Sequence, residues 1–430
     1  MKKKHRVIYF ISVLVFLFIA LYITTQIFQV KYSYLMKGNN TIELKVDSNN
    51  NVIVPDATDI AKFNYKLGTL YWVLSIALTL AIPLYLIVSG SATELKLWLK
   101  DHFRRNNLII ILYIFSIFTF LFLTSLPLSF FRGYYKMKLI GISNESLFSW
   151  IIRVFKSFLI NSITTTFIGF LCYKILNKAK KCAYLIIGLL TLPLYIMGTL
   201  IYPLYIDPVF NEFKPLENKI LEYKIKDLAN RADIKDLTLY EVDKSKETKA
   251  MNAYMTGVGN TKRIVLWDNT IKGLSEGETL VVAAHEMGHY KLKHIPKSIF
   301  MGALYSIFLL YLTEKFSRAF INKKGNKLKI YSIKDLAAIP IIILYFSLFS
   351  LLLTPISNGY TRYQEWQADK FAIELTEDNF SNATVEVKFL QNNISVPNVN
   401  GFIKFFRYDH PTPKERIEFS NGYNKFNKIP

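Results

Sequence analysis

The chain has 430 residues, of which 51% are hydrophobic and 15% aromatic, and its mean hydropathy is +0.22. With 18 Gly, 14 Pro and 2 Cys, this composition excludes a collagen-like, a disordered and a disulfide-stapled chain. Lys and Arg number 53 against 32 Asp and Glu, a net charge of +21. The basic residues lie largely in short loops between apolar runs, which is typical of membrane-flanking charge and argues against nucleic-acid binding.

Seven apolar segments are long enough to cross a bilayer, which takes about 20 residues. The first follows a basic start, but it is too long for a signal peptide and lacks a small-x-small cleavage site, so we expect a retained anchor. The sequence therefore predicts an integral multi-pass membrane protein. The expected spans are 7–30, 69–92, 108–130, 150–173, 182–206, 297–314 and 333–356.

The spans divide the chain into four parts. Five spans form an N-terminal membrane region (1–206), and spans six and seven occupy 297–356. The polar loop 207–296 and the C-terminal segment 357–430 lie outside the membrane. Two cysteines, Cys172 and Cys182, lie near the ends of consecutive spans and could pair. Nothing around them suggests a site, which favours unpaired thiols.

The polar loop reads as a small α+β unit. Apolar residues at helical spacing predict a helix within 212–232. Three short runs rich in β-formers, 237–242, 252–256 and 263–267, predict a small antiparallel sheet. The last two strands would be joined through Gly257, Gly259 and Asn260.

The chemistry begins on the next helix. Ser275 and Glu278 form a capping box that opens a helix running to about Lys293. This helix carries His285-Glu286-Met287-Gly288-His289. Two imidazoles four residues apart lie on one face, one turn from each other, which suits two ligands of a tetrahedral Zn²⁺ ion. Glu286 is then placed to act as general base towards a metal-activated water.

A third ligand has to come from elsewhere in the chain. A metzincin would place a histidine at position 295, but that residue is Ile295, and His294 is one residue out of register. A carboxylate from a later helix is the other common solution. Glu365 and Asp369 share one helical face, so Glu365 can ligate the metal while Asp369 orients a ligand imidazole. His410 precedes a short helix and could stabilise an oxyanion, although a lone histidine near prolines is more often structural.

These motifs together resemble the type I CAAX prenyl endopeptidases, which are integral-membrane gluzincins. The resemblance covers about 205–417. It rests on Asn252-Ala253-Tyr254, Gly257 to Gly259 with Lys262 to Leu266, His285 to His294, Arg362-x-x-Glu365-x-x-Ala368-Asp369-x-Phe371-Ala372, His410-Pro411 and Glu415-Arg416.

The resemblance implies a mainly α membrane protein. Its seven transmembrane helices would form a barrel around a water-filled chamber, capped by a small α+β gluzincin-type zinc protease domain. It implies one Zn²⁺ per chain held by His285, His289 and Glu365, with Glu286 as general base. His410 would stabilise the transition state, and Asp369 and Arg416 would hold the site together. An extended substrate would bind along Asn252, Ala253 and Tyr254.

We therefore expect a membrane-embedded zinc endopeptidase, acting as a monomer on peptides or on lipidated, CAAX-type proteins. The same chemistry would serve a membrane-protein quality-control protease, and the Lys- and Asn-rich composition suits a bacterial cell membrane. A seven-span transporter or receptor with an accidental motif is disfavoured because the spans hold few acidic residues. A protease with its zinc inside the bilayer is disfavoured by the charges flanking the motif, Glu276, Glu278, Lys291 and Lys293.

The sequence leaves the orientation in the membrane open. Short loops on the side of the N-terminus hold 18 Lys and Arg, whereas those on the opposite side hold 8. The positive-inside rule then places the catalytic domain outside. The family resemblance places it in the cytosol.

Overall fold

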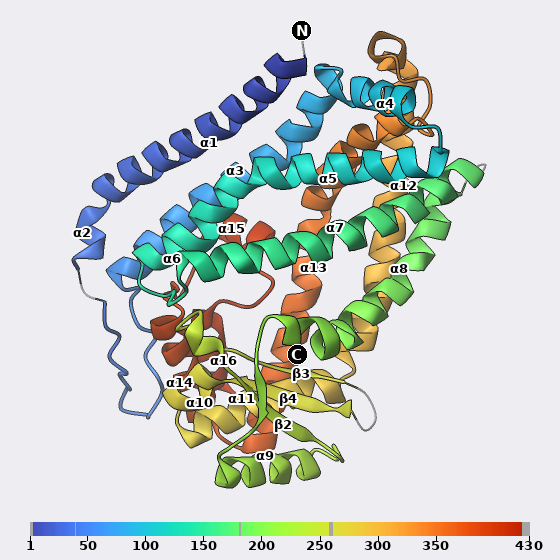
Figure 1. The fold of residues 1–430 in the computed structure, drawn as a ribbon. Helices are drawn as coiled ribbons and strands as arrows, with labels where there is room; N and C mark the ends of the chain where they lie inside the picture. The colour runs from blue at the N-terminus through green and yellow to red at the C-terminus, as the bar shows by residue number, and fades with distance from the viewer. Residues whose placement is uncertain (1–2, 39, 180–181, 258–260, 424–430) are drawn as a thin grey trace.

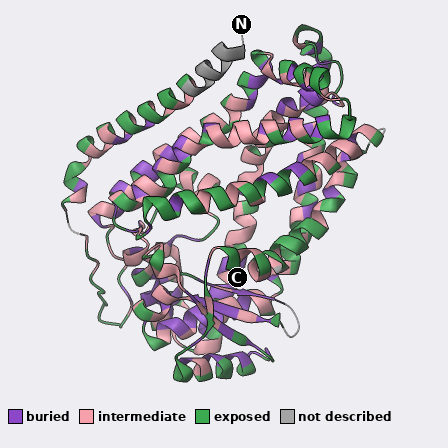
Figure 2. Ribbon diagram, in the orientation of Figure 1, coloured by how far each residue is buried: buried purple, intermediate pink, exposed green. Residues whose placement is uncertain are grey.

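The computed structural model describes residues 3–38, 40–179, 182–257 and 261–423. Long helices form a slanted cage, and a small domain with a sheet and short helices closes one end of it (Figure 1). Buried residues are concentrated in the small domain, whereas the long helices show mostly intermediate and exposed residues (Figure 2). This distribution is expected of helices whose outer surfaces face lipid.

Six helices of the described chain are long and apolar enough to span a bilayer, and they number seven if one bent pair is counted as a single span. Each lies at one of the expected spans, so the predicted multi-pass membrane protein is confirmed; a water-filled chamber inside the cage stays a prediction. The segments are α1 (Lys3–Lys31), α3 (Asp59–Val88), α5 to α6 (Asn106–Phe130 and Lys136–Leu139), α7 (Leu147–Lys178), α8 (Ala183–Leu200) with the turn Tyr202–Ile206, α12 (His294–Leu328) and α13 (Ile339–Thr376).

Shorter elements connect and cap these spans. They are α2 (Ser33–Met36), α4 (Ser91–His102), the π-helical turns η1 (Phe131–Tyr135) and η2 (Tyr202–Ile206), and the 3₁₀ turns η3 (Asp207–Val209), η4 (Lys244–Lys246) and η6 (Leu336–Ala338). The small domain adds α9 (Lys219–Arg231), α10 (Asp268–Gly273), α11 (Glu276–Lys291), α14 (Asn379–Asn392), α15 (Gly401–Arg407) and α16 (Pro413–Gly422). Both cysteine thiols are free, as favoured above.

The sheet differs from the expected antiparallel one. Its four strands are β1 (Phe213–Pro215), β2 (Thr238–Val242), β3 (Ala253–Thr256) and β4 (Arg263–Trp267), in the order β1-β2-β4-β3. The β3–β4 pair is antiparallel, but β2 and β4 run parallel. The reason lies in β4, whose continuous apolar run Ile264–Leu266 is fully buried. Such a strand belongs in the centre of a sheet, so it pairs on both sides.

The segment before β2 also differs from the expectation. The structure places strand β1 where a helix from residue 212 was expected, and helix α9 begins only after Asn218, whose side chain accepts a hydrogen bond from the Leu221 amide. This N-cap fixes the helix start. The expected turn residues Gly259 and Asn260 lie outside the described residues.

Helix α13 crosses the boundary that separated the seventh span from the C-terminal segment. It runs without a break through Pro355 and ends at Thr376, so Glu365 and Asp369 lie on an extension of the span itself. Helix α12 likewise begins at His294, before the expected span. The division into four parts therefore stays a prediction, with two of its boundaries close to or inside continuous helices.

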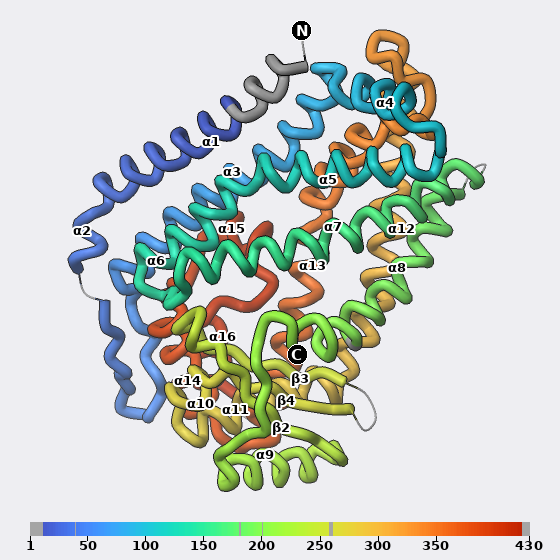
Figure 3. Tube along the Cα trace, viewed as in Figure 1, coloured from blue at the N-terminus to red at the C-terminus, as the bar shows by residue number. Residues whose placement is uncertain are grey.

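The connection between α2 and α3 descends to the small domain, as the tube in Figure 3 shows. There the amide of Val52 donates to the Asn421 side chain at 3.1 Å, and the Asn421 amide donates back to the Val52 carbonyl at 2.8 Å. Val52 is buried with Ala383, Val387 and Ile417. This strap fixes α14 and α16 to the membrane part of the chain.

Close packing of α11 on α13 depends on Gly288. A Cβ at this position would lie 3.2 Å from the Cα atom of Ala368 and 3.2 Å from the Cβ atom of Phe371. Both atoms belong to α13 and the first is backbone, so the neighbour cannot rotate away. Glycine thus sets the distance between the two helices.

We predict that Gly288→Val destabilises the protein by about 1–3 kcal/mol, because the larger side chain forces the two helices apart. Thermal or chemical unfolding in detergent would measure the change. Gly198→Val is the matched control, because Gly198 also lies in a helix but its Cβ would meet nothing within 4 Å. Equal stability of the two variants would contradict this role of Gly288.

Candidate metal centre

The helix that carries the two histidines is fixed at its start and along one face. Ser275 accepts from the amide of Glu278, and the Glu278 carboxylate accepts from the amide of Ser275, so the expected capping box is present. The run Val281–Ala284 and Met287 are buried against the sheet and the helices. The opposite face of α11 then presents His285, Glu286 and His289.

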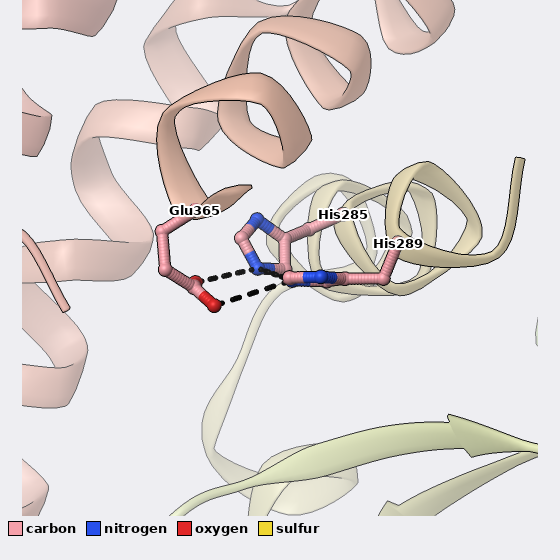
Figure 4. Close-up of side chains that lie close together, drawn as sticks. All are labelled: His285, His289 and Glu365. Atoms are coloured by element: carbon pink, nitrogen blue, oxygen red, sulfur yellow. Dashed lines mark hydrogen bonds and ion pairs between the residues drawn. The ribbon is translucent and has the colours of Figure 1, made fainter. Parts of the chain in front are cut away.

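Three side chains from two helices bring their donor atoms close together (Figure 4). The Nε2 atoms of His285 and His289 lie 3.1 Å apart. The Glu365 carboxylate, from α13, places Oε2 at 3.2 Å from His285 Nε2 and Oε1 at 3.4 Å from His289 Nε2. Glu365 is 5% exposed, so its charge is held away from water between two imidazoles.

This donor set fits a metal ion. Ligands about 2.0–2.1 Å from a tetrahedral ion lie about 3.3 Å from one another. The Nε2–Nε2 separation and the distance from each Nε2 atom to its nearer Glu365 oxygen are all close to that value. Two imidazole nitrogens and one carboxylate oxygen are also donors that leave a fourth position open in catalytic sites. The described part of the chain offers this group of three as a candidate metal site.

A chain of buried charges supports His285. Its Nδ1 atom lies 2.9 Å from Oδ1 of Asp369, which is fully buried. The Arg416 guanidinium donates to both carboxylate oxygens of Asp369, and its Nη1 atom lies 2.7 Å from Glu386 Oε1. With Nδ1 donating to Asp369, the imidazole keeps its Nε2 lone pair for a ligand.

The two carboxylates around Arg416 differ in pKa. Burial alone would lower the pKa of Arg416, but Asp369 and Glu386 raise it. Burial raises the pKa of Glu386 to about 7 against the opposing charge of Arg416, and the charge of Asp369 raises it further. The pKa of Asp369 is lowered to about 2, because Arg416 and His285 outweigh its burial.

His289 is supported by a second chain of donors. Lys293 lies between α11 and α12 with φ +57°, and this left-handed turn folds His294 back onto α11. His294 Nδ1 lies 2.9 Å from His289 Nδ1, and His294 Nε2 lies 3.2 Å from Gln367 Oε1. Since the amide oxygen only accepts, His294 carries its proton on Nε2 and accepts from His289 at Nδ1. The Nε2 lone pair of His289 is then free for a ligand as well.

Glu286 and His410 lie at this centre in different environments. Glu286 Oε2 accepts from the amide of Met255 at 3.2 Å, and burial raises the pKa of its carboxyl. His410 Nε2 lies 3.5 Å from Glu365 Oε1, and its Nδ1 lies 2.9 Å from Asp409 Oδ1. Asp409 raises the pKa of His410, whose side chain is 54% exposed.

The outer edge of the sheet faces the same centre. Trp267 donates to the Asn252 carbonyl, so residues 252, 254 and 256 bond inward to β4. The backbone groups of Ala253 and Met255 therefore point outward, as the bond from Met255 to Glu286 shows. The Asn252 side chain is exposed, whereas the Tyr254 hydroxyl donates to Asp207 Oδ2 at 2.9 Å.

Comparisons with known proteins decide the family. Peptidase family M48 matches residues 215–422, and the CAAX prenyl protease N-terminal domain, five membrane helices, matches residues 57–212. The Bacillus subtilis "Uncharacterized metalloprotease YhfN" is 35% identical over 333 residues, covering 77% of this chain and 78% of that protein. The chain belongs to peptidase family M48.

Other relatives agree with this assignment. CAAX prenyl protease 1 of Saccharomyces cerevisiae is 30% identical over 311 residues, covering 69% of this chain and 68% of that protein. The crystal structure of S. mikatae Ste24p aligns with a TM-score of 0.75 at 21% identity, covering 96% of this chain and 99% of that chain, which shows a shared fold. This M48 protein is thus an integral multi-pass membrane metalloendopeptidase, as expected, and the transporter or receptor alternative is not favoured.

Most of the expected site residues of this M48 protein lie together. His285, His289, Glu365, Asp369, His410 and Arg416 form one connected group. Glu286 follows His285 on α11 and contacts the Met255 amide. The roles of Glu386 and of His294 with Gln367 were not anticipated. His294 lies inside the motif that carried the resemblance, so a signal existed, whereas nothing in the sequence around Glu386 marks it.

We predict that Asp369→Asn in this M48 protein lowers metal affinity about 10–100-fold, because the amide supports the His285 imidazole less well than a carboxylate. Competition with a chromophoric chelator would measure the affinity of the purified protein. Asp378→Asn is the control, because Asp378 caps α14 and asparagine caps equally well. Equal affinities would show that Asp369 does not support the metal ligand.

Proposed function

We propose that this protein is a zinc endopeptidase whose single Zn²⁺ is held by His285, His289 and Glu365. The observation that supports this best is the approach of the two imidazoles to one carboxylate: the Nε2 atoms of His285 and His289 lie 3.1 Å apart, and each lies 3.2–3.4 Å from an oxygen of Glu365. Zinc, when bound, supplies a Lewis acid that polarises a peptide carbonyl and brings the pKa of water towards neutrality. All donors come from one chain, so we also propose that it acts as a monomer.

Glu286 is the proposed general base. It lies on α11 between the two histidines, and its carboxylate accepts from the Met255 amide at 3.2 Å. Burial raises the pKa of its carboxyl, so it accepts a proton more readily than an exposed glutamate. It would take a proton from the attacking water and deliver it to the leaving amine.

His410 is the proposed donor to the oxyanion of the tetrahedral intermediate. Its Nε2 atom faces the metal ligand Glu365, and Asp409 favours the protonated ring. A cationic donor beside a carbonyl stabilises the negative charge that develops during attack. Asp369 and Arg416 are proposed to position His285 and take no part in proton transfer.

The proposed substrate binds as an extra strand along β3. Ala253 and Met255 present their backbone groups outward, and Asn252 adds an exposed side chain next to them. An extended peptide paired here would lie beside Glu286. The relatives named CAAX prenyl proteases, together with the membrane cage, lead us to propose lipidated proteins of CAAX type as substrates. The similarity to the Bacillus subtilis protein supports a bacterial cell membrane as the location.

We predict that Glu286→Gln lowers kcat/KM by about 10²–10⁴-fold while zinc content stays near one per chain, because only the proton acceptor is lost. His285→Ala and Glu365→Ala should lose both zinc and activity, and a chelator should abolish the activity of the unaltered protein. Cleavage of a farnesylated fluorogenic peptide and metal analysis measure the two quantities. Glu276→Gln is the control, since Glu276 lies on the same helix and is exposed. Retained proteolysis in Glu286→Gln, or equal zinc in all variants, would refute these assignments.

The edge-strand pairing makes a second prediction. N-methylation of the substrate, one backbone position at a time, should lower kcat/KM at every second residue, because only alternate amides of a strand face its partner. The affected positions should also lower affinity for the Glu286→Gln protein. A uniform loss along the peptide, or none, would rule out pairing with β3.

A further inference from the structure

Two basic side chains, Lys136 of α6 and Arg407 of α15, converge on α3, and the charge of Arg132 lies near both. Lys136 is 9% exposed, and its Nζ atom donates to Asn64 Oδ1 at 2.8 Å. Arg407, at the end of α15, donates from Nη1 to Thr69 Oγ1 at 3.0 Å. Arg132 belongs to the π-helical turn that precedes Lys136, and such turns are frequent at functional sites.

Gly68 brings Lys136, which is buried, and Arg407, which is half-buried, together. A Cβ on Gly68 would lie 3.1 Å from Arg407 Nη2 and 3.5 Å from Lys136 Nζ. Both charged groups therefore rest against one residue of α3. Glycine inside a helix costs about 1 kcal/mol relative to alanine, and the space it leaves here is filled by these two groups.

No carboxylate of the described chain forms an ion pair with Lys136, Arg132 or Arg407. Lys136 donates to the neutral oxygen of Asn64, and Arg407 donates to that of Thr69 and lies 5.9 Å from the centre of the Tyr408 ring. Burial and the nearby charge of Arg132 lower the pKa of Arg407, although Tyr408 opposes this. Unpaired cations in such a place are costly, and an anion that binds between them removes the cost.

The cationic cluster is tied to the metal centre by a short stretch of chain. Arg407 and His410 are three residues apart, and Tyr408 between them is extended, so their Cα atoms are at most about 10 Å apart. Arg362, one turn before Glu365 on α13, donates to the Tyr408 carbonyl. A peptide with its cleaved bond at the metal would reach the cluster within a few extended residues.

The cluster is enclosed by protein on several sides. Helix α15 packs on α13, and Arg407 reaches across to α3. Lys136 is buried between these elements, while Arg132 is exposed and leaves one side open. This enclosure favours the end of a peptide chain over a phospholipid headgroup, which lies at the lipid-facing surface.

We propose that Lys136, Arg132 and Arg407 bind the free carboxylate terminus of the substrate. The inference rests on the proposed function and assigns the residues that would hold the chain terminus a few residues beyond the cleaved bond. Paired basic groups suit a carboxylate, because each oxygen can accept a charge-assisted hydrogen bond. The site would select substrates by their terminus as well as by any lipid.

Binding to the Glu286→Gln protein tests this without turnover. The probe is a farnesylated fluorescent peptide, made once with a terminal carboxylate and once with a carboxamide. We expect the carboxylate form to bind about ten-fold or more tightly, as charge-assisted hydrogen bonds imply. Lys136→Gln and Arg407→Gln, added to Glu286→Gln, should reduce that ratio towards one and leave the affinity for the carboxamide unchanged.

Two matched variants serve as controls. Lys138→Gln removes an exposed charge two residues further along and should keep the full ratio. Arg407→Lys retains the charge and should keep part of it, which separates the loss of charge from misfolding. Unfolding temperatures of all variants check that they fold.

A ratio near one in the Glu286→Gln protein, or an unchanged ratio in the Lys136 and Arg407 variants, would overturn the proposal. If the Lys136→Gln and Arg407→Gln variants lose phosphatidylglycerol binding in nanodiscs while their peptide ratio is unchanged, the cluster binds a lipid headgroup. That result would also overturn the proposal. Failure of the proposed function appears elsewhere, as absent zinc or absent cleavage by the unaltered protein.

Discussion

The contact between α11 and α13 is the constraint on which the metal centre depends. The two histidines lie on a helix of the polar loop, and the carboxylate that meets them lies on the extension of a membrane span. Gly288 lets the backbones approach until His285, His289 and Glu365 converge. The other members of the site act on one of these two helices: Arg416 secures Asp369 on α13, and His294 with Gln367 joins α11 to α13.

The buried charges of the site are arranged so that none is left without a partner of opposite sign or a hydrogen bond. Asp369 lies between His285 and Arg416, and Arg416 also contacts Glu386. Such a chain contributes more to position than to stability, because the cost of removing each charge from water offsets its attraction. What it provides is a fixed imidazole with its Nε2 lone pair directed at one point. The cationic cluster at Gly68 has no carboxylate partner among the described residues, which is why we propose that it binds an anionic ligand.

The sequence predicts the parts of this molecule whose signals are local. Apolar length predicts the spans, Ser275 and Glu278 predict the start of α11, and the spacing of His285 and His289 predicts a shared face. Signals that depend on tertiary partners are weaker. The parallel pairing of β2 and β4 is associated with the burial of Ile264–Leu266. The order of the strands in the sequence does not show which of them lies in the centre of the sheet. Glu386 has no local signature, because its role comes only from the approach of Arg416 on another helix.

Because α13 is one continuous helix, the membrane-spanning segment and the candidate metal ligand Glu365 move together. Glu365 lies 26 residues beyond the first residue of α13, a distance of about 39 Å along the helix axis. At that radius, a change of about 5° in the tilt of the helix displaces the carboxylate by about 3 Å, as much as its distance from His285. The tilt of a membrane-spanning helix depends on the thickness of the bilayer. A change in membrane thickness that altered this tilt would therefore move Glu365 relative to the two histidines.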